Sequence, residues 1–268
     1  METFRKYGQT YLLVLIFLLL TFHWFNQNSN HVRFFGDFPS IYAVMALAGG
    51  VLGIKIAQEW GGFRSIMGKA IWMFSLGLLL QVFGQIAYAY LAFFKQIEVP
   101  YPSIGDIGYF SSIPLYIYGV ILLAKASGVT IALRSYTHQM TAVLLPLVML
   151  IASYLFFLRA YEFDWSAPVR IFLDFGYPLG QSIYISLAIL TFLLSRKVLG
   201  GIMKNKIRFL ILALLVQYIA DYTFLFQVSK GTWVAGGIDD YMYLCAYFLM
   251  SIGLIQLNIK HLNLKSKS

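Results

Sequence analysis

Charge, cysteine and the usual signatures of catalysis are all scarce in this chain of 268 residues. Charged residues make up 12% of it, whereas a soluble globular domain carries about 25%. The single cysteine, Cys245, excludes an intrachain disulfide. The four histidines are too scattered for a zinc site, and no phosphate-binding loop, dinucleotide fingerprint or serine nucleophile elbow is present. We therefore expect neither a soluble enzyme nor a cofactor or metal centre.

Apolar sequence dominates instead, since 60% of the residues are hydrophobic. A helix needs about 20 apolar residues to cross the hydrocarbon of a bilayer, and the runs found here are too long for barrel strands. We predict an all-α, polytopic membrane helical bundle that forms one integral membrane domain over residues 1–268. About eight transmembrane helices are expected, at approximately 10–25, 40–58, 69–94, 104–124, 139–158, 169–194, 208–228 and 239–259.

The basic residues predict how these segments are oriented. With the N-terminus in the cytoplasm, 15 lysines and arginines fall on the inner side and 5 on the outer side. This bias follows the positive-inside rule, so we predict that both termini are cytoplasmic in a multi-pass protein of the cell membrane. The net charge of +9 is dispersed over the ends of apolar segments, which favours the lipid bilayer over nucleic acid as a partner. Every aspartate falls on the outer side or in the outer half of the membrane.

An aspartate followed three residues later by a tyrosine opens three of the long apolar segments. The preceding segments each carry a small residue and then a polar one deep in their apolar runs. Together these features predict a repeat of helical hairpins at approximately 69–125, 139–196 and 207–260. The Asp-x-x-Tyr pairs are Asp106 with Tyr109, Asp174 with Tyr177 and Asp240 with Tyr243, and the small-plus-polar pairs are Gly84-Gln85, Ala152-Ser153 and Ala220-Asp221.

Asp221 is the sharpest candidate site residue, because it lies well inside a predicted spanning helix. A carboxylate at that depth costs about 2.5–3.5 kcal/mol on insertion scales, so it should face the bundle interior and find a partner. Gln85 and Ser153 occupy equivalent repeat positions, and we expect them to be its partners. Two interpretations remain open, a residue of a functional pocket or a structural hydrogen bond between helices.

The three Asp-x-x-Tyr pairs also allow two interpretations. An aspartate in the first turn of a helix complements the helix dipole and caps free N–H groups, and tyrosine suits the membrane interface. Alternatively, three hairpins packed around one axis would bring these side chains together above Asp221, where they would line an acidic, aromatic cavity that binds a ligand. The segment from Tyr177 through Pro178 to Gln181 would open onto the same pocket, and we count Gln181 among the candidate ligand-binding residues.

Four short motifs follow one another in an order typical of one family of membrane modules: Tyr101-Pro102-Ser103-x-x-Asp106-x-x-Tyr109, Phe175-Gly176-Tyr177-Pro178-Leu179-Gly180-Gln181, Ala220-Asp221 and Gly237-Ile238-Asp239-Asp240. They resemble the eight-span N-terminal sensor module of bacterial diguanylate cyclases, phosphodiesterases and some histidine kinases. The resemblance covers most of the chain and is strongest from about Leu76 to Leu257. It implies a sensory role with a small-molecule or lipid ligand. Family members often carry aspartate where this chain has Gln85 and Gln181, so proton-linked chemistry is not expected there.

No output domain follows Lys260 in this sequence, so the resemblance leads us to expect a free-standing, sensor-like protein that signals through a cytoplasmic or membrane partner. The basic segment 196–208 or the basic tail would contact that partner, although the same charges also suit anionic lipid.

Two alternatives belong to other classes of function. The small-plus-polar pairs are also similar to the lysoplasmalogenase family, eight-span lipid hydrolases thought to use two membrane-embedded aspartates. Asp221 fits one of them, but Gln85 stands in place of the other, and an amide cannot act as a general base. A small transporter built from parallel repeats is the third hypothesis. We favour a binding protein over an enzyme.

Overall fold

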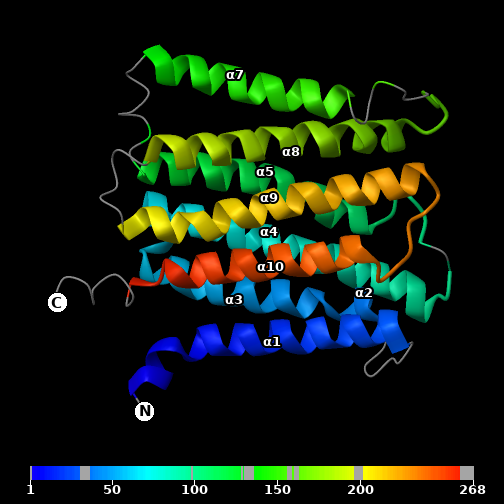
Figure 1. The fold of residues 1–268 in the computed structure, drawn as a ribbon, viewed down its shortest axis with the longest axis horizontal. Coiled ribbons are helices and arrows are strands. Elements are labelled where there is room, and N and C mark those ends of the chain that lie inside the picture. The colour runs from blue at the N-terminus through cyan, green and yellow to red at the C-terminus, as the bar shows by residue number, and fades with distance from the viewer. Residues whose placement is uncertain are drawn as a thin grey trace.

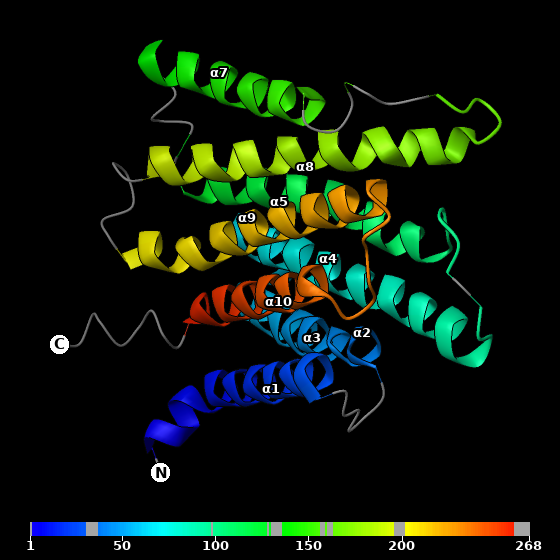
Figure 2. The same ribbon diagram turned by 45° about the vertical axis from the view of Figure 1, so that its right-hand side comes forward.

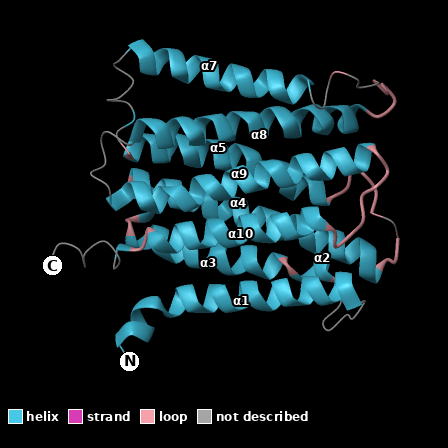
Figure 3. Ribbon diagram, in the orientation of Figure 1, coloured by secondary structure: helices cyan, strands magenta, loops and turns pink. Residues whose placement is uncertain are grey.

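The computed structural model describes residues 2–30, 37–97, 99–127, 129, 136–155, 159, 163–195 and 202–259. Within these ranges the chain forms helices and connecting loops and no strand (Figure 3). The elements in chain order are α1 (Glu2–Asn30), α2 (Phe38–Ile41), α3 (Ala43–Glu59), η1 (Gly62–Arg64), α4 (Ile66–Ala89), η2 (Tyr90–Phe94), α5 (Gly105–Ala126), α7 (Tyr136–Ser153), α8 (Pro168–Ser195), α9 (Ile202–Ser229) and α10 (Ile238–Gln256).

Seven segments of the described chain are long and apolar enough to cross a membrane, which confirms a multi-pass helical membrane protein. The predicted span 139–158 corresponds to α7, whose apolar part covers only the 17 residues Tyr136–Ala152. The predicted first span was too short, because α1 continues from Glu2 to Asn30 and is apolar from Tyr7 to Ser29. A short polar stretch at either end of an apolar run does not stop a helix whose backbone bonds are already formed.

Six helices close into a ring in which each packs against the next: α3, α4, α5, α8, α9, α10 and again α3. Outside the ring, α1 lies against α10 and α3, and α7 lies mainly against α8 (Figures 1 and 2). The predicted arrangement of three hairpins around one axis is therefore wrong for the middle hairpin, since its first helix, α7, packs on the outside of the ring against α8. The shorter apolar run of α7 and its exposed outward face suit a position against lipid.

Small residues on α3 allow it to pack closely against its two neighbours in the ring, α4 and α10. A Cβ added at Gly49 would collide with the Ser251 side chain of α10, and one added at Gly53 would collide with Ser75 of α4. Helices approach this closely where both faces carry small side chains, because van der Waals contact between backbones drives their association in lipid. These glycines of α3 thus allow close contact both with α4, the next helix of the ring, and with α10, the last one.

Two long-range hydrogen bonds show which helix ends lie together. Trp60, just after α3, donates from Nε1 to the carbonyl of Leu257, just after α10, at 2.7 Å. Trp24, near the end of α1, donates to the carbonyl of Gly236, just before α10, at 3.0 Å. The start of α1 and the end of α10 therefore lie at one end of the bundle, and the loops before α5 and α10 lie at the other (Figure 1).

Candidate functional site

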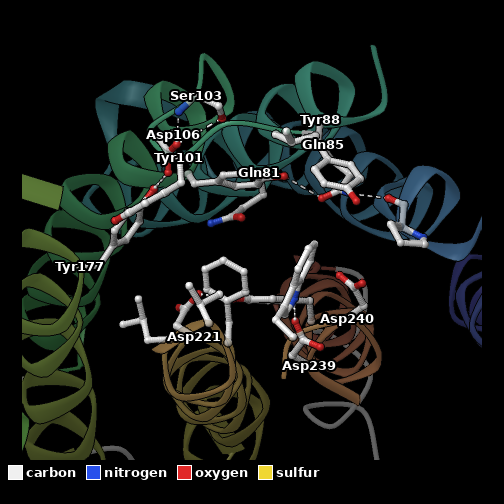
Figure 4. Close-up of a pocket in the computed structure, with 18 of the residues that line it drawn as sticks. Gln81, Gln85, Tyr88, Tyr101, Ser103, Asp106, Tyr177, Asp221, Asp239 and Asp240 are labelled. Atoms are coloured by element: carbon white, nitrogen blue, oxygen red, sulfur yellow. Dashed lines mark hydrogen bonds between the residues drawn. The ribbon is translucent and has the colours of Figure 1, made fainter. Parts of the chain in front are cut away.

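The ring of helices surrounds a cavity of about 1260 Å³ that extends to the loops before α5 and α10. Ligand pockets in proteins usually measure about 300–1000 Å³, so this space is large for one small molecule. Figure 4 shows side chains of α4 and α5 on one wall and Asp221, Asp239 and Asp240 on the facing wall. Nine of the ten residues proposed from the sequence line this cavity: Gln85, Asp106, Tyr109, Asp174, Tyr177, Gln181, Asp221, Asp240 and Tyr243. Ser153 ends α7, and its side chain is outside the described residues.

Asp106 starts α5 and also joins α5 to α8. Its Oδ2 accepts from the Ser103 N–H at 2.7 Å, and the Ser103 hydroxyl accepts from the Gly105 N–H at 3.2 Å. These two bonds tie the residues before α5 to its first turn and satisfy N–H groups that the helix start leaves without partners. Its Oδ1 faces the ring interior and accepts from the Tyr177 hydroxyl at 2.9 Å. Asp106 therefore fits both interpretations, since one oxygen bonds at the helix start and the other faces the cavity.

Asp174 does not cap its helix, contrary to the prediction. Because α8 begins at Pro168, Asp174 lies beyond the first turn, and its partners come from elsewhere. The Tyr101 hydroxyl donates to its Oδ1 at 2.7 Å, and Arg170 Nε lies 3.7 Å from its Oδ2. Burial, together with the bond to this carboxylate, raises the pKa of Tyr101 well above its usual range, so that Tyr101 stays a donor at neutral pH.

Asp221, in α9, is held by three neutral donors on three helices. Gln181 Nε2 of α8 lies 2.6 Å from its Oδ2, and the Tyr243 hydroxyl of α10 lies 2.7 Å from its Oδ1. Gln217 Nε2, one turn away on α9, adds a longer contact of 3.4 Å. The predicted pairing with Gln85 is wrong, because Gln85 lies on α4, which is not a neighbour of α9 in the ring. Equivalent repeat positions fall on different sectors of a ring and do not meet.

Gln85 forms three hydrogen bonds on the facing wall. Its Oε1 accepts from the Tyr109 hydroxyl at 2.8 Å and the Tyr42 hydroxyl at 3.0 Å, while its Nε2 donates to the Pro39 carbonyl. The adjacent Gly84 leaves room for the Tyr109 ring, which brings that hydroxyl within reach. The buried amide thereby links the start of the second span to α4 and α5.

The start of α10 carries two buried carboxylates. Asp240 lies in the first turn of α10, as predicted, and accepts from the N–H of Gly236, which precedes the helix, at 2.6 Å. Asp239 accepts from Trp233 Nε1 at 2.9 Å, and both residues line the cavity. Sequence reasoning missed Asp239 and Trp233 as site residues, although the adjacent aspartates were a visible signal. It also missed Gln81, a polar residue in the apolar run of α4, whose Oε1 accepts from the Tyr247 hydroxyl at 3.0 Å.

The carboxylates of this cavity are spread over several helices. In the part of the chain that the structure describes, no group of three or more His, Cys, Asp or Glu side chains is close enough to hold a metal ion. Neutral donors from tyrosine, amide and tryptophan side chains hold most of the carboxylate oxygens instead. The site is therefore a polar, aromatic chamber inside an apolar bundle.

Comparisons with known proteins do not assign this chamber, since no protein-family model, no curated protein and no solved structure matches the chain. The fold and the cavity nevertheless define a class, a multi-pass helical membrane protein with an acidic and aromatic chamber that reaches the loops at one end of the bundle.

Proposed function

We propose that this protein binds a small ligand in the chamber and acts as a sensor-like protein of the cell membrane. The observation that carries the proposal is the cavity of about 1260 Å³ lined by carboxylates and tyrosines from five of the ring helices. A polar interior of this size is costly in a membrane bundle, where every buried polar group must find a partner. Such a cost is usually retained where the polar groups serve a function.

The orientation of the ligand site follows from the basic residues. With 15 of the 20 lysines and arginines on one side, we propose eight spans with both termini in the cytoplasm. The cavity reaches the loops at the opposite end of the bundle, so the ligand enters from the extracytoplasmic side. A ligand from outside and termini inside are the arrangement that a sensor needs.

Asp221 is placed to convert binding into a change of helix packing. Its two oxygens link α8, α9 and α10 through Gln181 and Tyr243. A ligand that takes one of these bonds lowers the free energy of the packing in which that bond is broken, and only such a differential interaction shifts a conformational equilibrium. The proposed contact with a signalling partner is the basic segment 196–208, of which 196–201 lie outside the described residues, or the basic tail, which also lies outside them.

An intramembrane hydrolase has less support from the site. That chemistry would need a second carboxylate where Gln85 stands, and the Gln85 amide is already bonded to Tyr42, Tyr109 and Pro39. A neutral amide can neither take nor give a proton at neutral pH.

Native mass spectrometry of the protein released from its own membrane tests the proposal. We expect a defined small molecule to stay with the wild type and to be lost from folded Asp221→Asn. Asp164→Asn is the matched control, because Asp164 is an exposed carboxylate in the loop before α8 and lies outside the cavity. If wild type and both variants carry only bulk lipid, the proposed ligand site does not exist.

A further inference from the structure

Most carboxylates of the chamber have no cationic partner in the part of the chain that the structure describes. Among the described residues, the ion pair at this site is the one between Arg170 and Asp174, at 3.7 Å. Asp106, Asp221, Asp239 and Asp240 accept only from neutral groups, and they face the same space from opposite walls (Figure 4). Neutral donors satisfy hydrogen bonds but do not cancel charge, and uncompensated charge inside a membrane protein is costly. The chamber therefore favours a positively charged occupant.

Two polar atoms on α8 lack a partner beside Asp221. Gln181 is 2% exposed and Tyr184, one turn further on, is 1% exposed, and both line the cavity. Gln181 Nε2 is bonded to Asp221, but Gln181 Oε1 and the Tyr184 hydroxyl have no hydrogen-bond partner. Buried polar groups in folded proteins are nearly always paired, so each exception needs an explanation. The Gln181 amide oxygen and the Tyr184 phenol oxygen can therefore each accept a hydrogen bond from a ligand that lies next to the Asp221 carboxylate.

The remaining walls near this corner are aromatic. Tyr116, Tyr243 and Tyr247 are packed beside Asp221 and Tyr184, and all of them line the cavity. The face of a phenol ring attracts a cation that lies within about 6 Å of its centre. The described residues form no cluster for a bare metal ion, and the cavity is many times larger than one. An organic cation with an apolar body matches both the acceptors and the rings.

We infer that the ligand is a soluble organic amine that enters from the loop end as its ammonium form and places its N–H donors against Asp221, Gln181 and Tyr184. This inference rests on the proposed function, since it names the class of ligand for the same chamber. Its apolar body lies along the tyrosine rings, where burial of apolar surface adds affinity.

Isothermal titration calorimetry of the purified protein in mild detergent tests the charge requirement with probes matched in shape. The first set is 2-phenylethylamine, 2-phenylethanol and phenylacetate, and the second is octylamine, octanol and octanoate. Hydrogen bonds to charged groups contribute about 1.5–3 kcal/mol, which corresponds to about 10- to 100-fold in affinity. We expect at least one amine to bind about tenfold or more tightly than its alcohol and its acid. In Asp221→Asn that advantage should fall about tenfold, whereas Asp164→Asn should match the wild type.

The outcomes separate this inference from the proposed function. If an alcohol or an acid binds as tightly as its amine, or if the compound found by native mass spectrometry carries no amine, the chamber is a ligand site but the cation assignment is overturned. The assignment is also overturned if no amine binds to a wild type that retains its native compound. If the protein retains no compound and binds no probe, both proposals fail.

Discussion

The hairpin α4–α5 and the hairpin α9–α10 place the same two contacts in the same register. Tyr109 of α5 donates to Gln85 of α4 at 2.8 Å, and Tyr243 of α10 donates to Asp221 of α9 at 2.7 Å. Further along, the Gly119 backbone lies against Phe74, and the Gly253 backbone lies against Leu210. The two hairpins therefore make matching contacts at matching places along their helices.

The two hairpins differ in one residue that changes what the shared position does. Gln85 is a neutral amide whose oxygen accepts from two hydroxyls and whose nitrogen donates to a backbone carbonyl, so its bonds join three segments of the bundle. Asp221 is an ionisable carboxyl group that only neutral donors contact, and its partner Gln181 has an oxygen without a partner. The same position thus links neighbouring helices in α4–α5, whereas in α9–α10 it places a carboxyl group beside an unpaired acceptor. Loss of stability should therefore be large at the first position and small at the second.

The largest expected effect comes from Gln85→Leu. This change leaves the hydroxyls of Tyr42 and Tyr109 and the carbonyl of Pro39 without a partner in the interior, and each orphaned buried group costs about 1–3 kcal/mol. We expect the free energy of unfolding to fall by about 3 kcal/mol or more, measured by thermal unfolding in mild detergent. The control is Gln58→Leu, an exposed glutamine of α3, which should change little. Equal effects of the two changes would contradict the structural role of Gln85.

The tyrosines of the two hairpins provide a matched pair. Tyr243→Phe removes a donor to a carboxylate and should cost about 1.5–3 kcal/mol, whereas Tyr109→Phe removes a donor to an amide and should cost about 0.5–1.5 kcal/mol. Gln85 also keeps its bond from Tyr42 when Tyr109 is lost. The same unfolding assay measures both, and a double-mutant cycle adds the background Asp221→Leu. There the cost of Tyr243→Phe should vanish; if it persists, the cost arises from ring packing and not from the bond to Asp221.

The smallest expected change in stability comes from Asp221→Leu. Removal of the carboxylate leaves Gln181 and Tyr243 without an acceptor, which costs about 1–3 kcal/mol, but it also removes a charge whose burial costs about 2.5–3.5 kcal/mol on insertion scales. The two terms nearly cancel, so the midpoint of thermal unfolding should stay close to that of the wild type. A loss as large as that of Gln85→Leu would mean that Asp221 is a structural joint too, and the contrast between the hairpins would disappear.

Much of the candidate site could be predicted because its residues depart from their local surroundings. Asp221 and Gln85 are polar residues in apolar runs, and the Asp-x-x-Tyr spacing recurs near the starts of three apolar segments. Their pairing could not be predicted, since a repeat indicates which positions are equivalent and not which positions meet. The choice of Gln181 and Tyr243 as partners of Asp221 depends on α9 lying between α8 and α10 in the ring.

Composition and periodicity by themselves determined the class of fold. Long apolar runs must form helices that satisfy their own backbone groups in lipid, and this follows from local sequence alone. Only the tertiary structure decided that six helices close around a chamber while α1 and α7 stay outside. Ring closure depends on side-chain fit between segments far apart in the chain, such as Gly49 against Ser251, and no local pattern contains that information.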